Sequence, residues 1–212
     1  MLKFLWICWH GLLRYRKEDK ISLSILIPCK EEPNVTEVIR ECEINFPEAK
    51  SVVCNDREGR GKGWAVREAL KHADSEWVCF IDGDMDIHPR MIRRLIPFTE
   101  DYDIILGKKQ IRGSLTRRLV TRVSRLVIRT LFAMDYDTQT GIKLFKRESI
   151  PEWDNDEYMF DLEIISKAHD AGFKIIEVPV EVTPYGSTSK TLRGKNIIRC
   201  FLETLKIWRK RI

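Results

Sequence analysis

The stretch Trp77-Val78-Cys79-Phe80-Ile81-Asp82-Gly83-Asp84 places an apolar run directly before two carboxylates that one glycine separates. A short apolar run bounded by polar residues predicts a buried strand of a parallel sheet. Ligands of open α/β sheets bind beyond the carboxyl ends of such strands. Two carboxylates at that edge are suited to one hard cation such as Mg²⁺, which takes its remaining ligands from water and substrate phosphates. Taken alone, the segment can also be an acidic turn that caps the next helix.

Length and composition favour one α/β domain without disulfide bonds. The chain has 212 residues, of which 33% are charged, and a formal net charge of +5. This length suffices to bury a core. The six cysteines form no CxxC pair, and Cys29, Cys54 and Cys79 lie in or beside apolar runs, where free cysteine acts as a small hydrophobe. The pattern indicates a reducing compartment and argues against a zinc site.

The N-terminal segment differs in composition from the rest of the chain. Residues 1–13, MLKFLWICWHGLL, are rich in Trp, Leu, Phe and Ile, and a charged stretch follows them. No apolar stretch reaches the length of about 20 residues that spans a bilayer. The pattern predicts an amphipathic membrane-interface segment over residues 1–20 and a single domain over 21–212. The alternative is a helix that docks on the core of this protein or on a partner.

Strand and helix patterns alternate along residues 21–212. Strands are expected at residues 22–28, 51–54, 77–81, 103–106, 142–145 and 174–180. Helices are expected after Asn34, over 64–72, from 91, and over 116–132, 161–171 and 194–209. This alternation predicts a mainly parallel sheet with helices on both faces. The chain shows no internal repeat, no low-complexity segment and no linker.

Two basic segments point to an anionic ligand. In Arg60-Gly61-Lys62-Gly63, glycines at a helix start can let backbone amides face an anion, although a plain basic turn fits equally well. Arg118, Arg122, Arg125 and Arg129 follow helical spacing, and no acid lies between Asp103 and Asp135 to offset them. Such a stripe indicates phosphate, lipid head groups or nucleic acid as a partner, and a solvated basic face is the alternative.

Two further segments carry polar groups. Asp161 and Glu163 enter a helix, where a carboxylate pair caps more often than it catalyses. Tyr185-Gly186-Ser187-Thr188-Ser189-Lys190 is a glycine- and hydroxyl-rich stretch that ends in a cation, so it can close over phosphates or serve only as a loop.

Several segments together resemble family 2 glycosyltransferases of the GT-A fold. Residues 27–34, IPCKEEPN, are similar to the IPxxNEExN opening of that family, GKGWA at 61–65 to its GKGxA loop, and Asp82-Gly83-Asp84 to its DxD motif. DTQTGIKLF at 137–145 is similar to the DTQCGFKLF segment of dolichyl-phosphate glucosyltransferases. FDLE, EVPV and GSTSK, at 160–163, 177–180 and 186–190, resemble motifs of polyprenyl-phosphate sugar synthases. The resemblance covers residues 21–210 and implies one GT-A-like, Rossmann-like domain.

The resemblance also implies a set of site residues. Mg²⁺ or Mn²⁺ would be held by Asp82, Asp84 and Asp86. The nucleotide-sugar donor would be bound by Pro28, Lys30, Glu31, Asp56, Gly61, Lys62, Asp82 and Gly83. The acceptor would be bound by Lys109, Arg118, Arg122, Gln139, Ser189 and Lys190. The residues expected to act in catalysis are Asp82, Asp84, Lys109 and Arg122.

The implied reaction moves a hexose, mannose or glucose, from GDP-mannose or UDP-glucose to a polyprenyl or dolichyl phosphate. The protein would act as a peripheral protein at the cytoplasmic membrane face, without a nucleic-acid partner, and a membrane-anchoring partner subunit would fit the family. A phosphate acceptor whose second pKa is about 6 is largely ionised at neutral pH, so it needs no strong general base.

The chain departs from the family pattern at three places. Lys30 stands where the family usually has Asn, and Lys109 stands where it has Arg, so the bidentate fork of arginine is lost there. The segment from Ile27 to Gly61 is too short for the second strand, helix and third strand that usually complete the nucleotide pocket. Either the 52–56 segment is the base-binding edge, or this half of the pocket is reduced.

Three other functions are alternatives to this one. A family 2 transferase with a different hydroxyl acceptor would need a general base, for which Asp137 and Asp161 are the candidates. A catalytically silent GT-A module could bind membranes or a partner subunit. A nucleic-acid binder would explain the arginine stripe but not the acidic strand.

The N-terminal segment generates a prediction of its own. Deleting residues 1–13 should leave a folded domain that sediments less with anionic vesicles, because the deleted segment carries the apolar and aromatic side chains that enter the interface. Circular dichroism checks the fold, and vesicle sedimentation measures the binding. Unchanged sedimentation would move the membrane contact to the arginine helix or to residues 197–208.

Overall fold

A computed structural model describes residues 21–109, 115–183 and 194–211. Its side chains are placed from residue 122 in the helix that begins at 115, and from residue 198 in the helix that begins at 194. The predicted membrane-interface segment, residues 1–20, lies outside the described part of the chain. Among the described residues, the structure has no helix long and apolar enough to cross a membrane.

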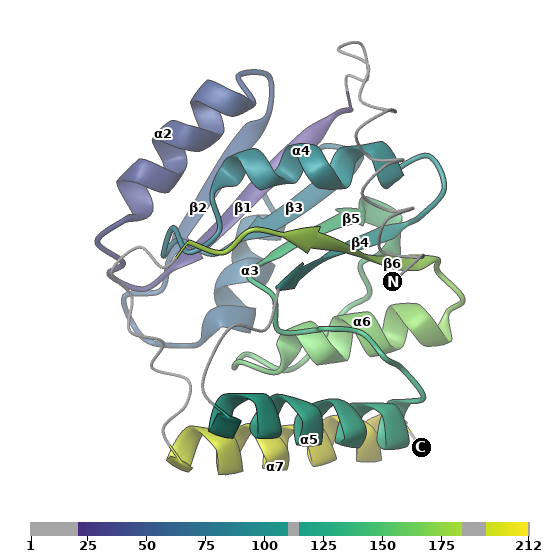
Figure 1. Cartoon of the computed structure of the whole chain (residues 1–212). Coiled ribbons are helices and arrows are strands. Elements are labelled where there is room, and N and C mark those ends of the chain that lie inside the picture. The colour runs from purple at the N-terminus through teal and green to yellow at the C-terminus, as the bar shows by residue number, and fades with distance from the viewer. Residues whose placement is uncertain (1–20, 110–114, 184–193, 212) are drawn as a thin grey trace.

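A mixed sheet forms the centre of the molecule (Figure 1). Its strands are β1 Leu23–Cys29, β2 Lys50–Asn55, β3 Trp77–Ile81, β4 Ile104–Lys109, β5 Ile142–Lys146 and β6 Ile175–Val180, in the order β2-β1-β3-β5-β4-β6. β1 is parallel to both of its neighbours, and β4 is parallel to β6. β5 alone runs antiparallel, to β3 on one side and β4 on the other.

Helices cover both faces of this sheet. The α-helices are α2 Val35–Asn45, α3 Lys62–Leu70, α4 Ile92–Leu95, α5 Leu115–Phe132, α6 Phe160–Asp170 and α7 Gly194–Arg211. Short 3₁₀ turns occur at Pro89–Met91, Ile96–Phe98 and Arg147–Ser149. In Figure 1, α2 and α4 lie above the sheet, α3 and α6 lie below it, and α5 with α7 forms the lowest layer.

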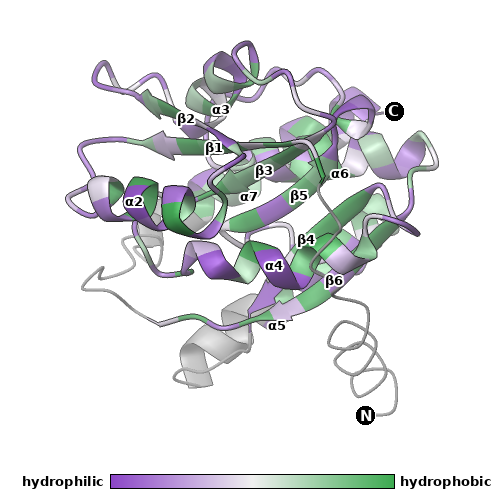
Figure 2. Ribbon diagram, turned by 90° about the horizontal axis from the view of Figure 1, so that it is seen from above, coloured by the Kyte–Doolittle hydropathy of each residue, from purple (hydrophilic) through white to green (hydrophobic). Residues whose placement is uncertain are grey.

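The two faces follow from the alternation of side chains along each strand. In β1, Ile25 and Ile27 pack against one core cluster, which also holds residues of α2 and α4. Leu26 points the other way, into a second cluster built by α3, α5, α6 and α7. Because β1 is buried on both sides, most of its residues are apolar (Figure 2).

The fold predicted from the sequence is confirmed: one α/β domain with a mainly parallel sheet and helices on both faces. The antiparallel direction of β5 was not predicted, because periodicity reports which residues are buried and not the direction of a strand. β2 is an edge strand among the described residues, with no further strand beyond it. The segment from Ile27 to Gly61, which the sequence indicates is short, therefore adds no strand outside β2 among the described residues.

Candidate functional site

Asp82 lies directly after β3, where the sheet ends. Its amide donates a hydrogen bond to the carbonyl of Gly141, at 2.9 Å. A Cβ atom on Gly141 would lie 2.4 Å from Oδ2 of Asp82, so only glycine leaves room for this carboxylate. The other carboxylate oxygen, Oδ1, lies 2.6 Å from the Lys62 ammonium. Neighbouring segments therefore hold Asp82 in one place.

Asp84 continues this acidic edge. The amide of Asp86 donates to Oδ1 of Asp84 at 3.0 Å, and the Asn34 side chain donates to the Asp84 carbonyl at 3.2 Å. Burial, and then the negative charge of Asp82, raises the pKa of Asp84 to about 6. Met85 and Glu31, which flank the same edge, have left-handed φ angles of 66° and 50°. Non-glycine residues seldom adopt this conformation, and such strain clusters at functional sites.

The acidic edge fits a divalent cation with two protein ligands. The described residues include no group of three or more acidic, histidine or cysteine side chains placed to hold a metal. The expectation that Asp86 is a third ligand stays a prediction, and its amide donates to Asp84. Two carboxylates, one of them destabilised as an anion by its neighbour, still suit Mg²⁺ or Mn²⁺, because such ions complete their shell with water and phosphate oxygens.

A chain of alternating charges runs inward from Asp82. Lys143, in β5, lies 3.0 Å from Asp161 at the start of α6, and the two side chains are only 2% and 5% exposed. The Lys143 ammonium also donates to the Thr140 carbonyl at 2.6 Å. Burial lowers the pKa of Lys143 and raises that of Asp161, and each partner only in part offsets this effect.

Lys62 joins this buried pair to the acidic edge. Burial acts to lower the pKa of Lys62, but the charges of Asp82 and then Asp161 outweigh it and raise the pKa. Burial likewise acts to raise the pKa of Asp82, but the charge and hydrogen bond of Lys62 outweigh this effect and lower the pKa. Lys62 is therefore a cation shared between the acidic edge and the interior.

The start of α3 is closed by the protein itself, contrary to the expected anion site. The amides of Gly63 and Trp64 donate to the Asp156 carbonyl, at 2.8 and 3.3 Å. A Cβ atom on Gly61 or Gly63 would lie 2.1 or 2.2 Å from a carbonyl of the 155–156 segment. These glycines thus admit a loop of the same chain, and the amides of Gly63 and Trp64 are already paired.

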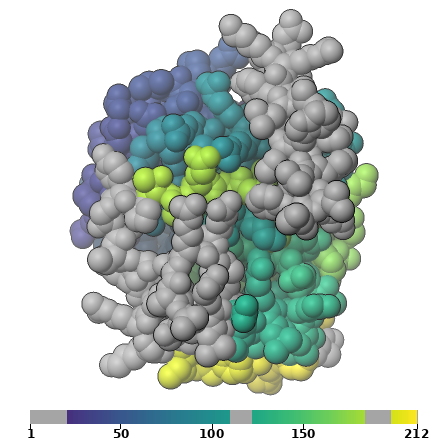
Figure 3. All heavy atoms as spheres, in the orientation of Figure 1, coloured from purple at the N-terminus to yellow at the C-terminus, as the bar shows by residue number. Residues whose placement is uncertain are grey.

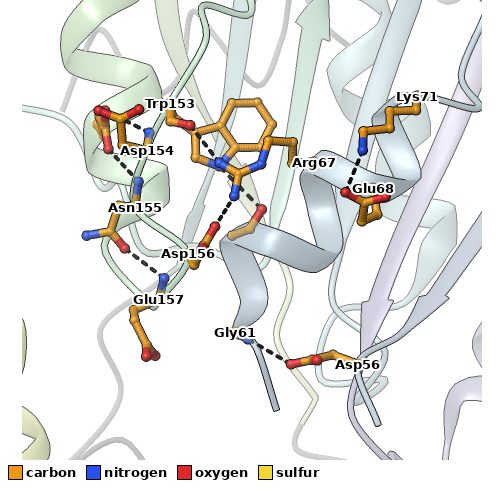
Figure 4. Close-up of polar contacts among 12 residues, drawn as sticks. Asp56, Gly61, Arg67, Glu68, Lys71, Trp153, Asp154, Asn155, Asp156 and Glu157 are labelled. Carbon is orange, nitrogen blue, oxygen red and sulfur yellow. Dashed lines mark hydrogen bonds and ion pairs between the residues drawn. The ribbon is translucent and has the colours of Figure 1, made fainter. Parts of the chain in front are cut away.

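Arg67 secures this loop from the next turn of α3. Figure 4 shows the Arg67 guanidinium between Trp153 and Asp156. It donates to the Trp153 carbonyl at 2.7 Å and forms an ion pair with the Asp156 carboxylate. The buried Glu163 accepts from the amides of Asp154 and Asn155, at 3.2 and 3.0 Å. Glu163 therefore braces this loop, whereas the N-cap of α6, Met159, has no side-chain hydrogen bond, so the expected capping of α6 is not seen.

Residues expected to bind the donor gather at the ends of β1 and β2. A Cβ atom on Gly83 would lie 3.6 Å from the Pro28 carbonyl, so β1 and the acidic edge meet there. Lys30 reaches over the loop after β2 and lies 2.8 Å from the Cβ position of Gly59. Glu31 is exposed, and its amide donates to the Asn55 side chain at 3.5 Å.

Asp56 holds its own loop in this region. Its carboxylate oxygens accept from the amides of Arg60 and Gly61, each at 2.8 Å. Burial acts to raise the pKa of Asp56, but these hydrogen bonds outweigh it and lower the pKa. The structure thus gives Asp56 a role in shaping the loop, and its expected contact with a nucleotide base stays a prediction.

On the expected acceptor side, Lys109 ends β4, which is antiparallel to β5 as β3 is, so Lys109 and Asp82 lie at the same edge of the sheet. Arg122 is exposed on α5. Arg125 lies 3.7 Å from Glu177 of β6, so an acid distant in sequence offsets the arginine stripe. Gln139 is exposed, and its amide donates to the Asp137 carboxylate at 3.2 Å. The side chain of Arg118, and Ser189 and Lys190, lie outside the described part of the chain.

The sequence analysis missed Lys143 and Glu177. A lysine in the middle of an apolar strand was the available signal for Lys143, because such a lysine must be paired if it is buried. Glu177 accepts from the Asp137 amide at 2.6 Å and pairs with Lys108 and Arg125. Its partners come from three other segments, so no local pattern pointed to it.

Comparisons with known proteins agree with this geometry. The family model described as glycosyl transferase family 2 matches residues 5–150, more than half of the chain. Glycosyltransferase AglJ of Haloferax volcanii is 30% identical over 147 residues, which are 64% of this chain and 48% of the relative. Dolichyl-phosphate beta-glucosyltransferase ALG5C of Trichomonas vaginalis is 21% identical over 194 residues, 80% of this chain and 55% of the relative. The chain thus spans about half the length of these two relatives.

Solved structures share the fold at low identity. Glucosyl-3-phosphoglycerate synthase from Mycobacterium tuberculosis, in complex with Mn²⁺, UDP-glucose and phosphoglyceric acid, superposes with a TM-score of 0.70 at 16% identity, over 89% of this chain and 80% of that one. Mannosyl-3-phosphoglycerate synthase from Rubrobacter xylanophilus gives 0.67 at 13% identity, over 90% and 74%. These likenesses show the GT-A fold for this chain.

The buried pair generates a stability prediction. Lys143→Met should lower the free energy of unfolding by about 3–5 kcal/mol, because it leaves the Asp161 carboxylate buried without its nearest cation. The double variant Lys143→Met, Asp161→Leu should be more stable than Lys143→Met alone. Urea unfolding measures both variants.

The exposed pair Lys210–Asp154, at 2.8 Å, is the control. Lys210→Met should change the free energy of unfolding by less than about 1 kcal/mol. If Lys143→Met changed the free energy of unfolding as little as Lys210→Met does, the buried ion pair would not contribute to stability as proposed.

Proposed function

The chain belongs to glycosyl transferase family 2, and we propose that it transfers a hexose from a nucleotide sugar to a polyprenyl or dolichyl phosphate at the cytoplasmic face of a membrane. The observation that carries the proposal is the acidic edge: Asp82 and Asp84 beyond the end of β3, with Lys62 on Asp82. UDP-glucose as the donor fits the Mycobacterium neighbour, and a lipid phosphate as the acceptor fits the Trichomonas relative.

Asp82 and Asp84 would hold Mg²⁺ or Mn²⁺, which when bound offsets the negative charge of the nucleoside diphosphate as it leaves. The bound cation in the Mycobacterium complexes supports this choice. The Lys62 ammonium lies 2.6 Å from the Asp82 carboxylate, and its flexible side chain is partly exposed. Lys62 could therefore leave Asp82 and bind a phosphate oxygen of the donor instead. Pro28, Lys30, Glu31 and Gly83 would form the donor side of the same edge.

Lys109 would bind the acceptor phosphate, since β4 ends at the same edge of the sheet as β3. Arg122 would bind the same phosphate from α5. An ionised phosphate needs no strong base, so a site that is rich in cations suits this acceptor. Asp161 is a poor candidate for a general base, because its carboxylate is buried against Lys143. Asp137 remains the candidate base for an alcohol acceptor.

A small phosphorylated acceptor is the second candidate. The Mycobacterium neighbour was solved with phosphoglyceric acid, and cations beside the acidic edge would serve any phosphate. The two acceptors differ in their partition: a glycosylated lipid phosphate enters an organic phase, whereas a glycosylated phosphoglycerate stays in water.

Radiolabelled sugar transfer tests the proposed function. With Mn²⁺ and labelled UDP-glucose or GDP-mannose, a polyprenyl phosphate should yield label in the organic extract, and phosphoglycerate should yield little labelled product. Asp84→Asn should lower the transfer at least about a hundredfold, because it removes a ligand charge while it preserves side-chain size. Folding of the variant is checked by circular dichroism.

Two outcomes of this assay would contradict the proposal. Transfer to phosphoglycerate alone would select the second candidate. No transfer from any nucleotide sugar, with the protein folded and Mn²⁺ present, would support the silent membrane-binding module.

The Lys62 contact generates a separate prediction about metal binding. Lys62→Met should tighten the binding of Mn²⁺ alone by about tenfold, which equals about 1.4 kcal/mol, because it removes the cation that competes for Asp82. The same variant should bind Mn²⁺ with UDP more weakly than the wild type does, since the phosphate loses a cation. Electron paramagnetic resonance of free Mn²⁺ measures both affinities.

Lys71→Met is the matched control. Lys71 is exposed at the opposite end of α3 from Lys62 and pairs with Glu68 at 2.7 Å. It should leave both affinities unchanged. Equal Mn²⁺ binding by Lys62→Met and wild type would show that Lys62 does not compete for this edge.

A further inference from the structure

Large apolar side chains gather on one outer face of the molecule. Eight such residues are exposed in the described part of the chain, and five of them lie on α5 and α7. They are Val123 and Leu126 on α5, and Ile198, Phe201 and Leu202 on α7, with exposed fractions between 48% and 64%. We call these five residues the apolar face. Single exposed apolar residues are ordinary, whereas a group on adjacent helices marks an interaction surface.

The two helices lie beside each other. Ile128 of α5 and Ile207 of α7 belong to the same core cluster, and the Arg211 guanidinium lies 5.4 Å from the centre of the Phe132 ring. Both helices run in the same direction along the lowest layer of Figure 1, and α7 forms the lower edge of the view in Figure 3. Their inner sides are buried in the domain, so the apolar face is a second, outward side of each helix.

A tyrosine extends this surface. Tyr158 is 48% exposed, and the residues on both sides of it are tied to α7. Glu157 forms an ion pair with Arg199, and the Met159 amide donates to Glu203 at 3.3 Å. Tyrosine is enriched where protein meets the boundary between lipid and water.

Basic residues border the apolar face. Arg122 and Arg129 on α5, and Lys206 and Arg209 on α7, are exposed. Among the described residues no acid forms an ion pair with these four, although Arg125, Arg199, Lys210 and Arg211 each have one. Apolar side chains bordered by unpaired cations are complementary to a bilayer that carries anionic head groups.

We infer that the apolar face and its basic border dock on the surface of an anionic membrane. Val123, Leu126, Ile198, Phe201 and Leu202 enter the boundary region between head groups and acyl chains, and Arg129, Lys206 and Arg209 contact the head groups. This contact rests on the proposed function for the lipid substrate, whereas the surface itself is defined by the exposure and charge of its residues.

The docked orientation brings the lipid surface to the candidate site. α5 begins at Leu115, a few residues after β4 ends at Lys109 beside the acidic edge. Arg122 lies on α5 between that end and the centre of the apolar face. A phosphate at the membrane surface would therefore meet Arg122 and Lys109 without leaving the head-group layer.

Vesicle binding of the full chain tests the inference. Leu126→Ser with Phe201→Ser should lower partition onto vesicles of phosphatidylcholine and phosphatidylglycerol more than about tenfold, because two apolar side chains no longer enter the bilayer. Ile44→Ser is the matched control: Ile44 is 58% exposed on α2, in the layer on the other side of the sheet, and its substitution should leave partition unchanged.

The basic border is tested in the same assay. Arg129→Gln with Lys206→Gln should weaken binding to anionic vesicles at low salt, by about fivefold per charge, and should leave the weaker binding to pure phosphatidylcholine unchanged. Lys174→Gln, at an exposed lysine beside β6, is the control for loss of charge.

Three results would overturn the inference. Leu126→Ser with Phe201→Ser could bind vesicles as the wild type does, which would leave the contact to residues 1–13. The wild type could be a dimer that the same variant dissociates, without vesicle binding by either, and the surface would then join two copies. Equal loss of binding in the Ile44→Ser control would indicate a general effect. Vesicle binding is measured independently of sugar transfer. The protein can therefore bind membranes without transferring sugar, or transfer sugar without binding through this face, and the two proposals can fail separately.

Discussion

The ion pair between Lys62 and Asp82 joins two parts of the molecule that arise far apart in the chain. Asp82 belongs to the acidic edge after β3, and Lys62 begins α3 on one side of the sheet. The same lysine interacts with Asp161, which Lys143 of β5 neutralises inside the domain. A buried charge costs several kcal/mol unless it is paired, so this alternation of charges is a condition for the domain to fold with its acidic edge intact.

Backbone contacts give this arrangement its precision. Gly141 leaves room for the Asp82 carboxylate, and Gly61 and Gly63 leave room for the 155–156 segment. That segment closes the start of α3, and Arg67 and Glu163 hold it in place. As a result, the Lys62 side chain emerges from a helix end that is fully braced. In our account, this rigid support is what lets a flexible lysine exchange partners without disturbing the sheet.

Sequence patterns captured the architecture and the location of the acidic edge, because both depend on local features. The run from Trp77 to Ile81 is buried in the structure, and Asp82 and Asp84 follow it. The antiparallel direction of β5 could not be predicted in this way, since it depends on the path of the chain between strands. The partner of the GKG glycines could not be predicted for a related reason: glycine signals close approach, but the approaching group is the Asp156 carbonyl of a distant loop. The offset of Arg125 by Glu177 is likewise a contact between distant segments.

We propose that Lys62 holds the acidic edge until a metal and a diphosphate take its place. A crystal structure of the protein with Mn²⁺ and UDP would show the exchange. The metal should lie on Asp82 and Asp84, and the Lys62 ammonium should have moved from Asp82 to a phosphate oxygen. A metal bound elsewhere, or bound at this edge with Lys62 still 2.6 Å from Asp82, would contradict it.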